Sequence, residues 1–391
     1  MTGVRHAAVA AALVLSLAGA GTALAVPQPD GAAATASSDS KGVRLELPRP
    51  TGPYAVGRNT LHLVDHSRRD PWVPSAGARE LMVSVYYPAR PGTGRAAPYM
   101  TTEGARQLLE YQDLAELVPA EVLSGTRTHS ATGARPARGR FPLVVLSPGF
   151  TAPRTTISAL AEDLTSRGYV VATVDHAYEA VGANFTGGRI LPCTACDLPP
   201  ESTGKVPGVR AKDLSFVLDE LTGRHPAWAY SRMIDRTRIG MAGHSIGGAS
   251  TAAAMESDPR IRAGVNMDGS FHSWPTAGGL GGRAFMMLGT ESLHVPGGRD
   301  TTWDRAWDRM DGWKRWATVA GAGHFSFTDL PPLGAQLGLS DPEAPLPGKR
   351  AAEITNGYVG AFFDLHLRGI AQPLFDGPSP ANPEVTLHHL P

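Results

Sequence analysis

Hydrophobic and polar positions alternate along the chain in blocks that predict strands followed by helices. The runs at 141–147 and 169–174 are continuously apolar, which is typical of strands buried on both faces of a sheet. Five shorter apolar runs predict further strands, at 81–87, 239–242, 262–267, 283–288 and 316–319.

Between these runs, apolar residues recur at helical spacing. Helices are expected at 154–168, 208–223, 246–257 and 357–368, and the first two end at a glycine. Strands that alternate with helices in this way predict an α/β fold, in which helices cover both faces of a mainly parallel sheet.

Other segments leave more than one interpretation open. Residues 101–123 read as a helix whose apolar face packs on the core, with a lid over an apolar site as the alternative. Trp303 and Trp307 lie one helical turn apart and are expected to pack their helix on the sheet, with an aromatic wall for a ligand as the alternative. Residues 124–140 and 178–207 are rich in turn-forming residues and are expected to be loops.

The N-terminal residues have the layout of an export signal. Arg5 supplies a positive start, an apolar run follows, and residues 23–25 have the small-x-small pattern that signal peptidase cuts. We therefore expect residues 1–25 to be a signal peptide and residues 26–42, which are small and polar, to be a disordered leader. The apolar run is too short to span a bilayer comfortably, so we expect a secreted protein with at most transient contact with a lipid surface.

The remaining residues, 43–391, are expected to form a single domain. It carries a helical and loop insertion at about 99–140 and a Pro-rich tail from about residue 371.

Charge and short motifs exclude several classes of protein. The chain has 36 basic and 36 acidic residues, so its net charge of zero supplies no long-range attraction for nucleic acid. Its sequence contains no metal-ligand cluster, P-loop or dinucleotide fingerprint. We therefore expect no cofactor, no metal ion and no nucleic-acid partner.

The two cysteines, Cys193 and Cys196, have the spacing of a redox pair but not its context. Pro192 precedes them and Pro199 and Pro200 follow, which is incompatible with the strand and helix that flank a redox motif. Zinc would need two further soft ligands nearby. In an exported protein the expected result is a disulfide that tightens a loop.

The sequence Gly243-His244-Ser245-Ile246-Gly247 fits the pattern G-x-S-x-G between an expected strand and an expected helix. This context presents the serine hydroxyl on a sharp turn at the edge of the sheet, with the helix N-terminus near a developing oxyanion. Ser245 is therefore the candidate nucleophile.

A serine nucleophile needs a base, and the chain has 13 histidines. His324 follows the last expected strand, which is where this fold places its base. His176 and His272 follow other strands, where they suit the lining of the site rather than the base. For the acid, Asp268 and Glu291 each follow a strand directly, and fold logic alone leaves both open.

Several segments resemble the plasma-type platelet-activating-factor acetylhydrolases and their bacterial lipase and esterase relatives. They are residues 141–175, G-H-S-I-G-G from 243, N-M-D-G from 266 and G-H-F-S-F-T-D from 323, within a likeness that spans about 81–370. The resemblance implies the α/β-hydrolase fold.

The resemblance also assigns roles. It favours Asp268 as the acid, 23 residues after Ser245, and leaves Glu291 in a supporting role. It implies that the backbone amides of Phe150 and Ile246 donate to the oxyanion. The family often has His where this chain has Pro148, and Phe where it has Ile246. Because the oxyanion donors are backbone groups, both changes should be tolerated there. They bear instead on the preference for acyl and leaving groups.

The expected function is therefore a secreted carboxylic-ester hydrolase of the lipase or esterase type that works through an acyl-enzyme. Its partner is a small-molecule or lipid ester, including a phospholipid with an acetyl or short acyl group. The alternatives are an amidase or peptidase on the same residues, and a non-catalytic ligand-binding relative. The intact Ser245, Asp268 and His324 argue against the last of these.

Overall fold

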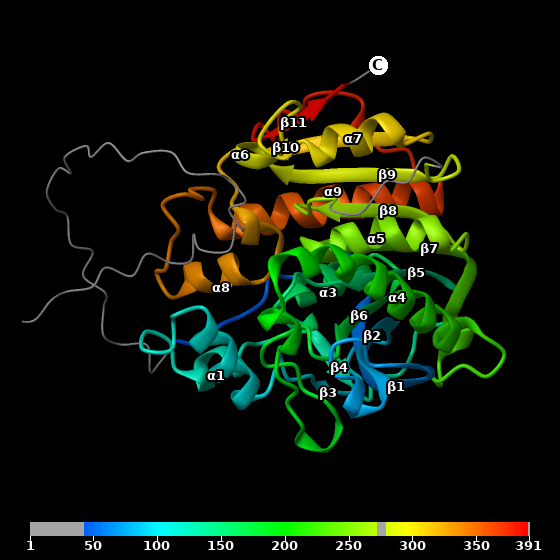
Figure 1. Ribbon diagram of the computed structural model, residues 1–391, viewed down its shortest axis with the longest axis vertical. Coiled ribbons are helices and arrows are strands. Elements are labelled where there is room, and N and C mark those ends of the chain that lie inside the picture. The colour runs from blue at the N-terminus through cyan, green and yellow to red at the C-terminus, as the bar shows by residue number, and fades with distance from the viewer. Residues whose placement is uncertain (1–42, 272–278, 390–391) are drawn as a thin grey trace, which may run out of the picture.

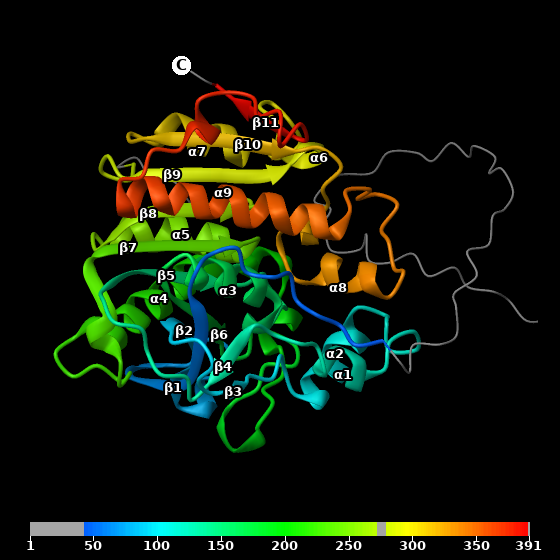
Figure 2. The same cartoon turned by 180° about the vertical axis from the view of Figure 1, so that it is seen from behind.

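The computed structural model describes residues 43–271 and 279–389. The expected signal peptide (1–25), the expected leader (26–42) and His272 lie outside these described residues. Figures 1 and 2 show the fold from opposite sides.

The described strands form one 11-stranded sheet in the order β11-β10-β9-β8-β7-β5-β6-β2-β1-β4-β3. Their bounds are β1 Ala55–Arg69, β2 Ala78–Ala89, β3 Arg95–Ala96, β4 Ser130–Thr132, β5 Phe141–Ser147, β6 Val170–His176, β7 Ile234–His244, β8 Ile261–Met267, β9 Ala284–Thr290, β10 Lys314–Val319 and β11 Val385–His388. From β6 through β5 to β10 every neighbouring pair is parallel. The expected mainly parallel sheet is confirmed, with antiparallel strands added at both sides.

Helices cover both faces of the sheet, as expected. The α-helices are α1 Thr102–Tyr111, α2 Ala120–Ser124, α3 Ser158–Ser166, α4 Val206–Thr222, α5 Ile246–Ser257, α6 Glu291–His294, α7 Thr302–Arg309, α8 Leu330–Gln336 and α9 Gly348–Arg368. In Figure 1, α4, α5 and α7 lie in front of the sheet, and in Figure 2 α9 crosses in front of it. This arrangement is the α/β-hydrolase fold.

The alternation of side chains along each central strand divides the core into two layers. Leu143 and Val145 of β5 belong to the cluster that α4 and α5 complete, whereas Val144 and Leu146 belong to the cluster that α3 and α9 complete. Because successive strand residues point to opposite faces, a strand buried by helices on both sides must be apolar throughout. That is why these strands were recognisable as continuous apolar runs.

The segment 101–123 differs from the single helix that its periodicity predicts. It forms two short helices, α1 and α2, with Asp113 at a positive φ of 56° between them and Pro119 as the residue that precedes α2. The leucines on the apolar face pack in a separate cluster with the segment at 45–47 and with Leu333 of α8. The apolar residues of this segment are thus spaced so that they pack in this cluster, although the segment is not one continuous helix.

The expected loops also contain short regular elements. The loop at 124–140 includes β4, which pairs in parallel with the start of β1. Helical turns of three to six residues break up the loop at 178–207, and a disulfide joins Cys196 of the turn Thr194–Asp197 to Cys193, the residue that precedes it. Short 3-10 turns are assigned at Pro74–Ala76, Arg154–Ile157, Thr186–Gly188, Thr194–Asp197, Pro200–Lys205, Ser231–Met233, His324–Phe327 and Pro373–Phe375.

Besides the two- and three-residue strands β3 and β4, two strands escaped prediction. β1 pairs antiparallel with β2 over most of its 15 residues, but its sequence mixes apolar, polar and charged side chains because it is only partly covered. β11 lies in the Pro-rich tail and pairs antiparallel with β10 at the edge of the sheet.

Within the described residues, no helix combines the length and the hydropathy that crossing a bilayer requires.

Candidate active site

Ser245 lies on a sharp turn between β7 and α5. Its backbone has φ 55° and ψ −126°, a conformation that a non-glycine residue rarely adopts and that is typical of the nucleophile in this fold. A Cβ added at Gly243 would lie 2.2 Å from the carbonyl of Gly247, and one at Gly247 would lie 2.1 Å from the carbonyl oxygen of Ser147. The glycines of the motif are therefore needed for the close approach of the turn to itself and to β5.

The turn brings Ser245, His324 and Asp268 into one chain of hydrogen bonds. His324 Nε2 lies 3.0 Å from Ser245 Oγ, and His324 Nδ1 lies 2.6 Å from Asp268 Oδ2. His324 opens the short helical turn after β10, and Asp268 follows the last residue of β8. The His324 side chain is 35% exposed, so a substrate can reach it, while Asp268 is buried.

Asp268 is held by more than His324. Its Oδ1 accepts hydrogen bonds from the backbone N–H of Thr290, at 2.7 Å, and from His294 Nδ1, at 2.8 Å. Burial favours the neutral carboxyl, but the charge of His294 and the hydrogen bonds from both imidazoles hold the pKa of Asp268 well below its usual range. Asp268 is therefore a carboxylate at neutral pH.

The second candidate acid, Glu291, is placed elsewhere. It is the first residue of α6, its side chain is exposed, and among the described residues no hydrogen bond or ion pair joins it to His324. Of the two carboxylates that the sequence left open, Asp268 is the one in contact with the imidazole.

The two amides that the family resemblance assigns to the oxyanion come from separate parts of the chain. Phe150 lies just after β5, and Ile246 is the first residue of α5. Within the described part of the chain, neither amide donates to another backbone carbonyl outside its own element. Gly149 packs so closely that an added Cβ would lie 2.9 Å from His244 Nδ1.

A buried guanidinium holds the loop that carries Phe150. Arg210 of α4 donates through Nη1 to the carbonyl oxygen of Pro148, at 2.6 Å, and to Ser147 Oγ, at 3.2 Å. Arg210 also pairs with Glu179 at 2.7 Å, and the carbonyl of Glu179 accepts the amide of Thr151 at 3.0 Å. Both contacts fix the backbone on either side of Phe150.

Arg210 belongs to a buried charge cluster behind the site. Arg79, which is fully buried, pairs with Asp70, Glu179 and Asp213 at 2.6–2.8 Å. His176 completes the cluster through Asp213, at 2.8 Å, and Ser147 Oγ, at 3.0 Å.

Three members of this cluster, His176, Glu179 and Asp213, bring potential metal ligands within 4.8 Å of one another. Both carboxylates, however, already pair with Arg79, and Arg210 adds a second guanidinium. A dication there would have to share these carboxylates with two guanidinium cations, so this donor set does not fit a metal ion. His176, which was expected to line the site, is instead buried in the cluster.

His244, the residue before Ser245, holds the backbone of His324. Its Nε2 donates to the backbone oxygen of His324 at 2.7 Å, and the two rings lie 4.6 Å apart. Burial, followed by the neighbouring His324, lowers the pKa of His244 to about 3. A neutral His244 thus anchors the backbone of His324 without adding charge beside its ring.

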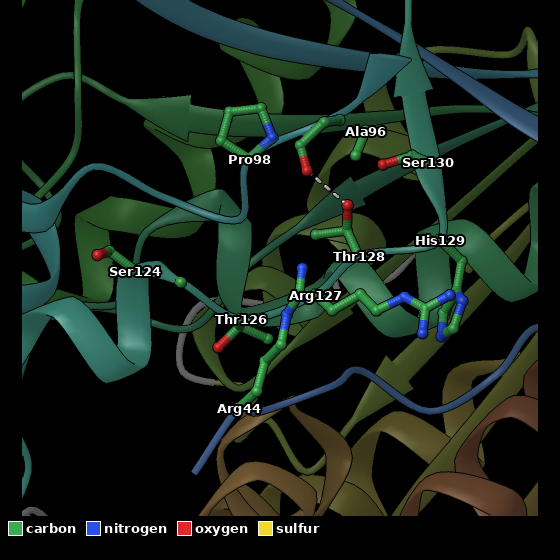
Figure 3. Close-up of a pocket in the computed structure, with 11 residues that line it drawn as sticks. Arg44, Ala96, Pro98, Ser124, Thr126, Arg127, Thr128, His129 and Ser130 are labelled. Carbon is green, nitrogen blue, oxygen red and sulfur yellow. Dashed lines mark hydrogen bonds between the residues drawn. The ribbon is translucent and has the colours of Figure 1, made fainter. Parts of the chain in front are cut away.

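A cavity of about 590 Å³ lies away from these groups (Figure 3). It is lined by residues around α2 and β4, including Arg44, Arg127 and His129. None of Ser245, Asp268 and His324 lines it.

Sequence reasoning missed His294 and Arg210. His294 lies four residues after the end of β9, near the carboxyl edge of the sheet, which was the available signal for a site residue. Arg210 carried no such signal, because it lies inside an amphipathic helix far along the chain from Pro148.

Comparison with known proteins gives the site its context. The family profile "Platelet-activating factor acetylhydrolase, isoform II" matches residues 39–186. A curated protein of Arthroderma benhamiae, described as "Probable 1-alkyl-2-acetylglycerophosphocholine esterase", is 30% identical over 87% of this chain and 92% of its own. A bis(hydroxyethyl) terephthalate hydrolase of Streptomyces coelicolor is 33% identical over 35% of this chain and 36% of its own.

Among solved structures, a ferulic acid esterase from Streptomyces cinnamoneus is 46% identical, with a TM-score of 0.80 over 88% of this chain and all of that chain. The similarity thus extends over the whole fold and not only over the nucleophile turn. The chain belongs to the platelet-activating-factor acetylhydrolase family of α/β-hydrolases and is a serine carboxylic-ester hydrolase.

Proposed function

We propose that Ser245, His324 and Asp268 form the catalytic triad of this ester hydrolase and that the reaction passes through an acyl-enzyme. The observation that carries the proposal is the unbroken path of hydrogen bonds from Ser245 Oγ through both nitrogens of His324 to Asp268 Oδ2, at 3.0 and 2.6 Å. A serine hydroxyl becomes a useful nucleophile only when a base in this position removes its proton.

The geometry supports the following steps. Ser245 Oγ attacks the ester carbonyl while His324 Nε2 takes its proton, and Asp268 stabilises the imidazolium that forms. His324 then gives the proton to the leaving alcohol, and the acyl group remains on Ser245. Water, deprotonated by His324, releases the acid in a second cycle of the same chemistry.

We propose the backbone amides of Phe150 and Ile246 as the oxyanion donors. Ile246 opens α5, whose N-terminal dipole favours negative charge, and Phe150 lies on the loop that Arg210 fixes. Each donor of this kind contributes about 3 kcal/mol to transition-state stabilisation.

For the substrate, we propose small esters of apolar or aromatic acids, ahead of phospholipids with a short acyl group. The support is the 46% identity to a ferulic acid esterase over its entire length, compared with 30% for the glycerophosphocholine esterase. Turnover of ethyl ferulate, bis(hydroxyethyl) terephthalate, p-nitrophenyl esters of rising chain length and a 2-acetyl phospholipid would test this order. If kcat/KM were greatest for the phospholipid, the proposed order of substrates would be reversed.

We further propose that the protein is secreted and that residues 43–391 act as one catalytic domain. The signal-like residues 1–25 and the disulfide between Cys193 and Cys196 support export to an oxidising compartment. The single sheet that runs from β11 to β3 supports one domain. The mass of the exported protein should correspond to a chain that begins at Val26.

The decisive test of the triad is Ser245→Ala. Hydrolysis of p-nitrophenyl acetate should fall by at least about 10⁴-fold, because the nucleophile is lost, while circular dichroism stays unchanged. A fluorophosphonate probe should label the wild-type protein and not the variant. A folded wild-type protein that remains unlabelled would favour ligand binding, and faster cleavage of matched anilides than of esters would favour an amidase.

A further inference from the structure

The carboxylate of Asp268 serves two histidines at once. Its Oδ2 contacts His324 Nδ1 at 2.6 Å, and its Oδ1 contacts His294 Nδ1 at 2.8 Å. The triad needs only the first of these contacts. The second places an imidazole of no assigned role directly on the acid.

His294 cannot serve as an alternative base for Ser245. Its Nε2 faces Asp300 Oδ2 at 3.2 Å, and the residue is 2% exposed. Its ring stacks on Trp303, with centroids 4.1 Å apart and planes at 26°. An added Cβ at Gly289 would lie 2.7 Å from the Trp303 ring and 2.9 Å from His294 Cβ, so β9 packs directly against the stacked pair.

The two partners of His294 determine its charge. An ionised carboxylate only accepts hydrogen bonds, so an imidazole with a carboxylate at each nitrogen must donate from both and carry a proton on both. Burial opposes this charge, but Asp268 and then Asp300 outweigh it and raise the pKa of His294 to about 9. His324 differs, because its second nitrogen faces the hydroxyl of Ser245, which can donate to it.

We propose that His294 is a positioning residue for ester hydrolysis: a fixed imidazolium that offsets the charge of Asp268 and so keeps His324 free of its proton, and able to act as base, in mildly acidic solution. The inference rests on the proposed triad. An uncompensated carboxylate beside His324 would strengthen the binding of a proton to its ring, and a cation on the other carboxylate oxygen opposes that effect.

The remaining charged groups near this pair do not replace His294. Asp300 binds its far side, and Asp304 of α7 accepts the amide of Gly297 instead. Glu291 is exposed on the same short helix, and His388 on β11 contacts Thr318. On the side of Ser245, the pKa of His244 is lowered to about 3, so that ring is neutral.

His294→Asn separates charge from hydrogen bonding. An asparagine amide nitrogen takes about the place of imidazole Nδ1, so the variant still donates to Asp268 but carries no charge. His388→Asn is the matched control, since His388 is also a partly buried histidine at this edge of the sheet and its partner is Thr318 rather than Asp268.

The measurement is kcat/KM for p-nitrophenyl acetate between about pH 4.5 and pH 9. In His294→Asn the midpoint of the acid limb should rise by about one pH unit, the size of effect expected for a unit charge several ångströms away. In His388→Asn the midpoint should stay where it is. A residue with a purely structural role would lower the plateau of the profile and leave the midpoint unmoved, and that result would overturn the proposal.

A second measurement can be read from the wild-type protein, with His294→Asn used only to assign the signal. In the ¹⁵N spectrum of the wild-type histidines near neutral pH, one buried imidazole should carry a proton on both nitrogens, and its signal should be lost in His294→Asn. Absence of such a signal from the wild type would overturn the proposal even if the variant failed to fold. A wild-type protein that neither reacts with fluorophosphonate nor hydrolyses esters would instead overturn the proposed triad.

Discussion

Asp268 illustrates how much of the chemistry is decided at single residues. It occupies a left-handed backbone conformation, with φ 59°, directly after β8, and that turn aims its two oxygens at different imidazoles. Left-handed geometry is costly for a residue with a Cβ and persists only where the surroundings hold it. Here the amide of Thr290 and the two histidines supply those contacts.

Two conservative changes distinguish the two candidate acids by the loss of kcat that each change causes. Asp268→Asn should lower kcat by about 10³- to 10⁴-fold, because an amide beside Nδ1 favours the wrong tautomer of His324. Glu291→Gln should change kcat by less than about 2-fold, because its exposed side chain makes no contact with the imidazole. Steady-state kinetics on one ester substrate measure both, and the reverse ranking would move the acid to α6.

Most positions of the proposed triad could be predicted because the fold places each of them at a strand end with a local signature. Gly243 and Gly247 identified the nucleophile turn, and His324 follows the last central strand. The choice of Asp268 over Glu291 was not derivable from spacing, since both follow a strand directly. The family resemblance favoured Asp268, and only three-dimensional geometry shows which carboxylate contacts the ring.

At the scale of elements, the loop after β5 depends on a helix that begins about sixty residues later. Arg210 of α4 reaches across to the carbonyl of Pro148 and thereby fixes the backbone that carries the amide of Phe150. Sequence patterns report contacts along one element and not between two distant ones, which is why this dependence was not predicted. The same reason explains β1, whose mixed sequence reflects partial cover by other parts of the chain.

Arg210→Met tests this dependence. The side chain keeps its bulk but loses its donors, so the amide of Phe150, the proposed oxyanion donor, loses its support. The value of kcat should then fall by about 10- to 100-fold, with KM changed by less than about 3-fold. Lys212→Met on the same helix is the control, because Lys212 has no contact with the loop among the described residues. Equal loss of kcat in both variants would contradict a specific role for Arg210.

At the scale of the whole molecule, the buried charge cluster joins the antiparallel side of the sheet to the helices that cover it. Arg79 lies on β2, Asp213 on α4 and Glu179 on the loop after β6. Burial raises the pKa of both carboxylates, but the nearby arginines outweigh it and leave the pKa of Asp213 and of Glu179 below its ordinary value. Depressed carboxyl pKa values contribute stability that is present above about pH 4 and is lost as the pH falls further.

Arg79→Met should reverse this dependence on pH. At pH 7 the variant should lose about 3–5 kcal/mol of stability, because the buried carboxylates of Asp70, Glu179 and Asp213 lose the cation that they share. As the pH is lowered from about 7 to 5, the midpoint of thermal unfolding of the variant should rise, because its buried carboxyls gain protons more readily when folded than when unfolded. Thermal scans of the wild type and the variant in the same buffers measure both midpoints against pH. If the two midpoints changed in parallel with pH, the prediction would be contradicted.

The position of β11 has a consequence for the order in which the molecule is completed. This strand comes from residues 385–388, well after β10 along the chain, yet it pairs with β10 and covers the side of the sheet. Until those residues emerge, the backbone of β10 presents unpaired amides and carbonyls, the kind of edge on which another chain can add a strand. A nascent chain therefore carries an exposed strand edge from the time β10 has formed until residues 385–388 have emerged, and pairing of β11 then closes that edge.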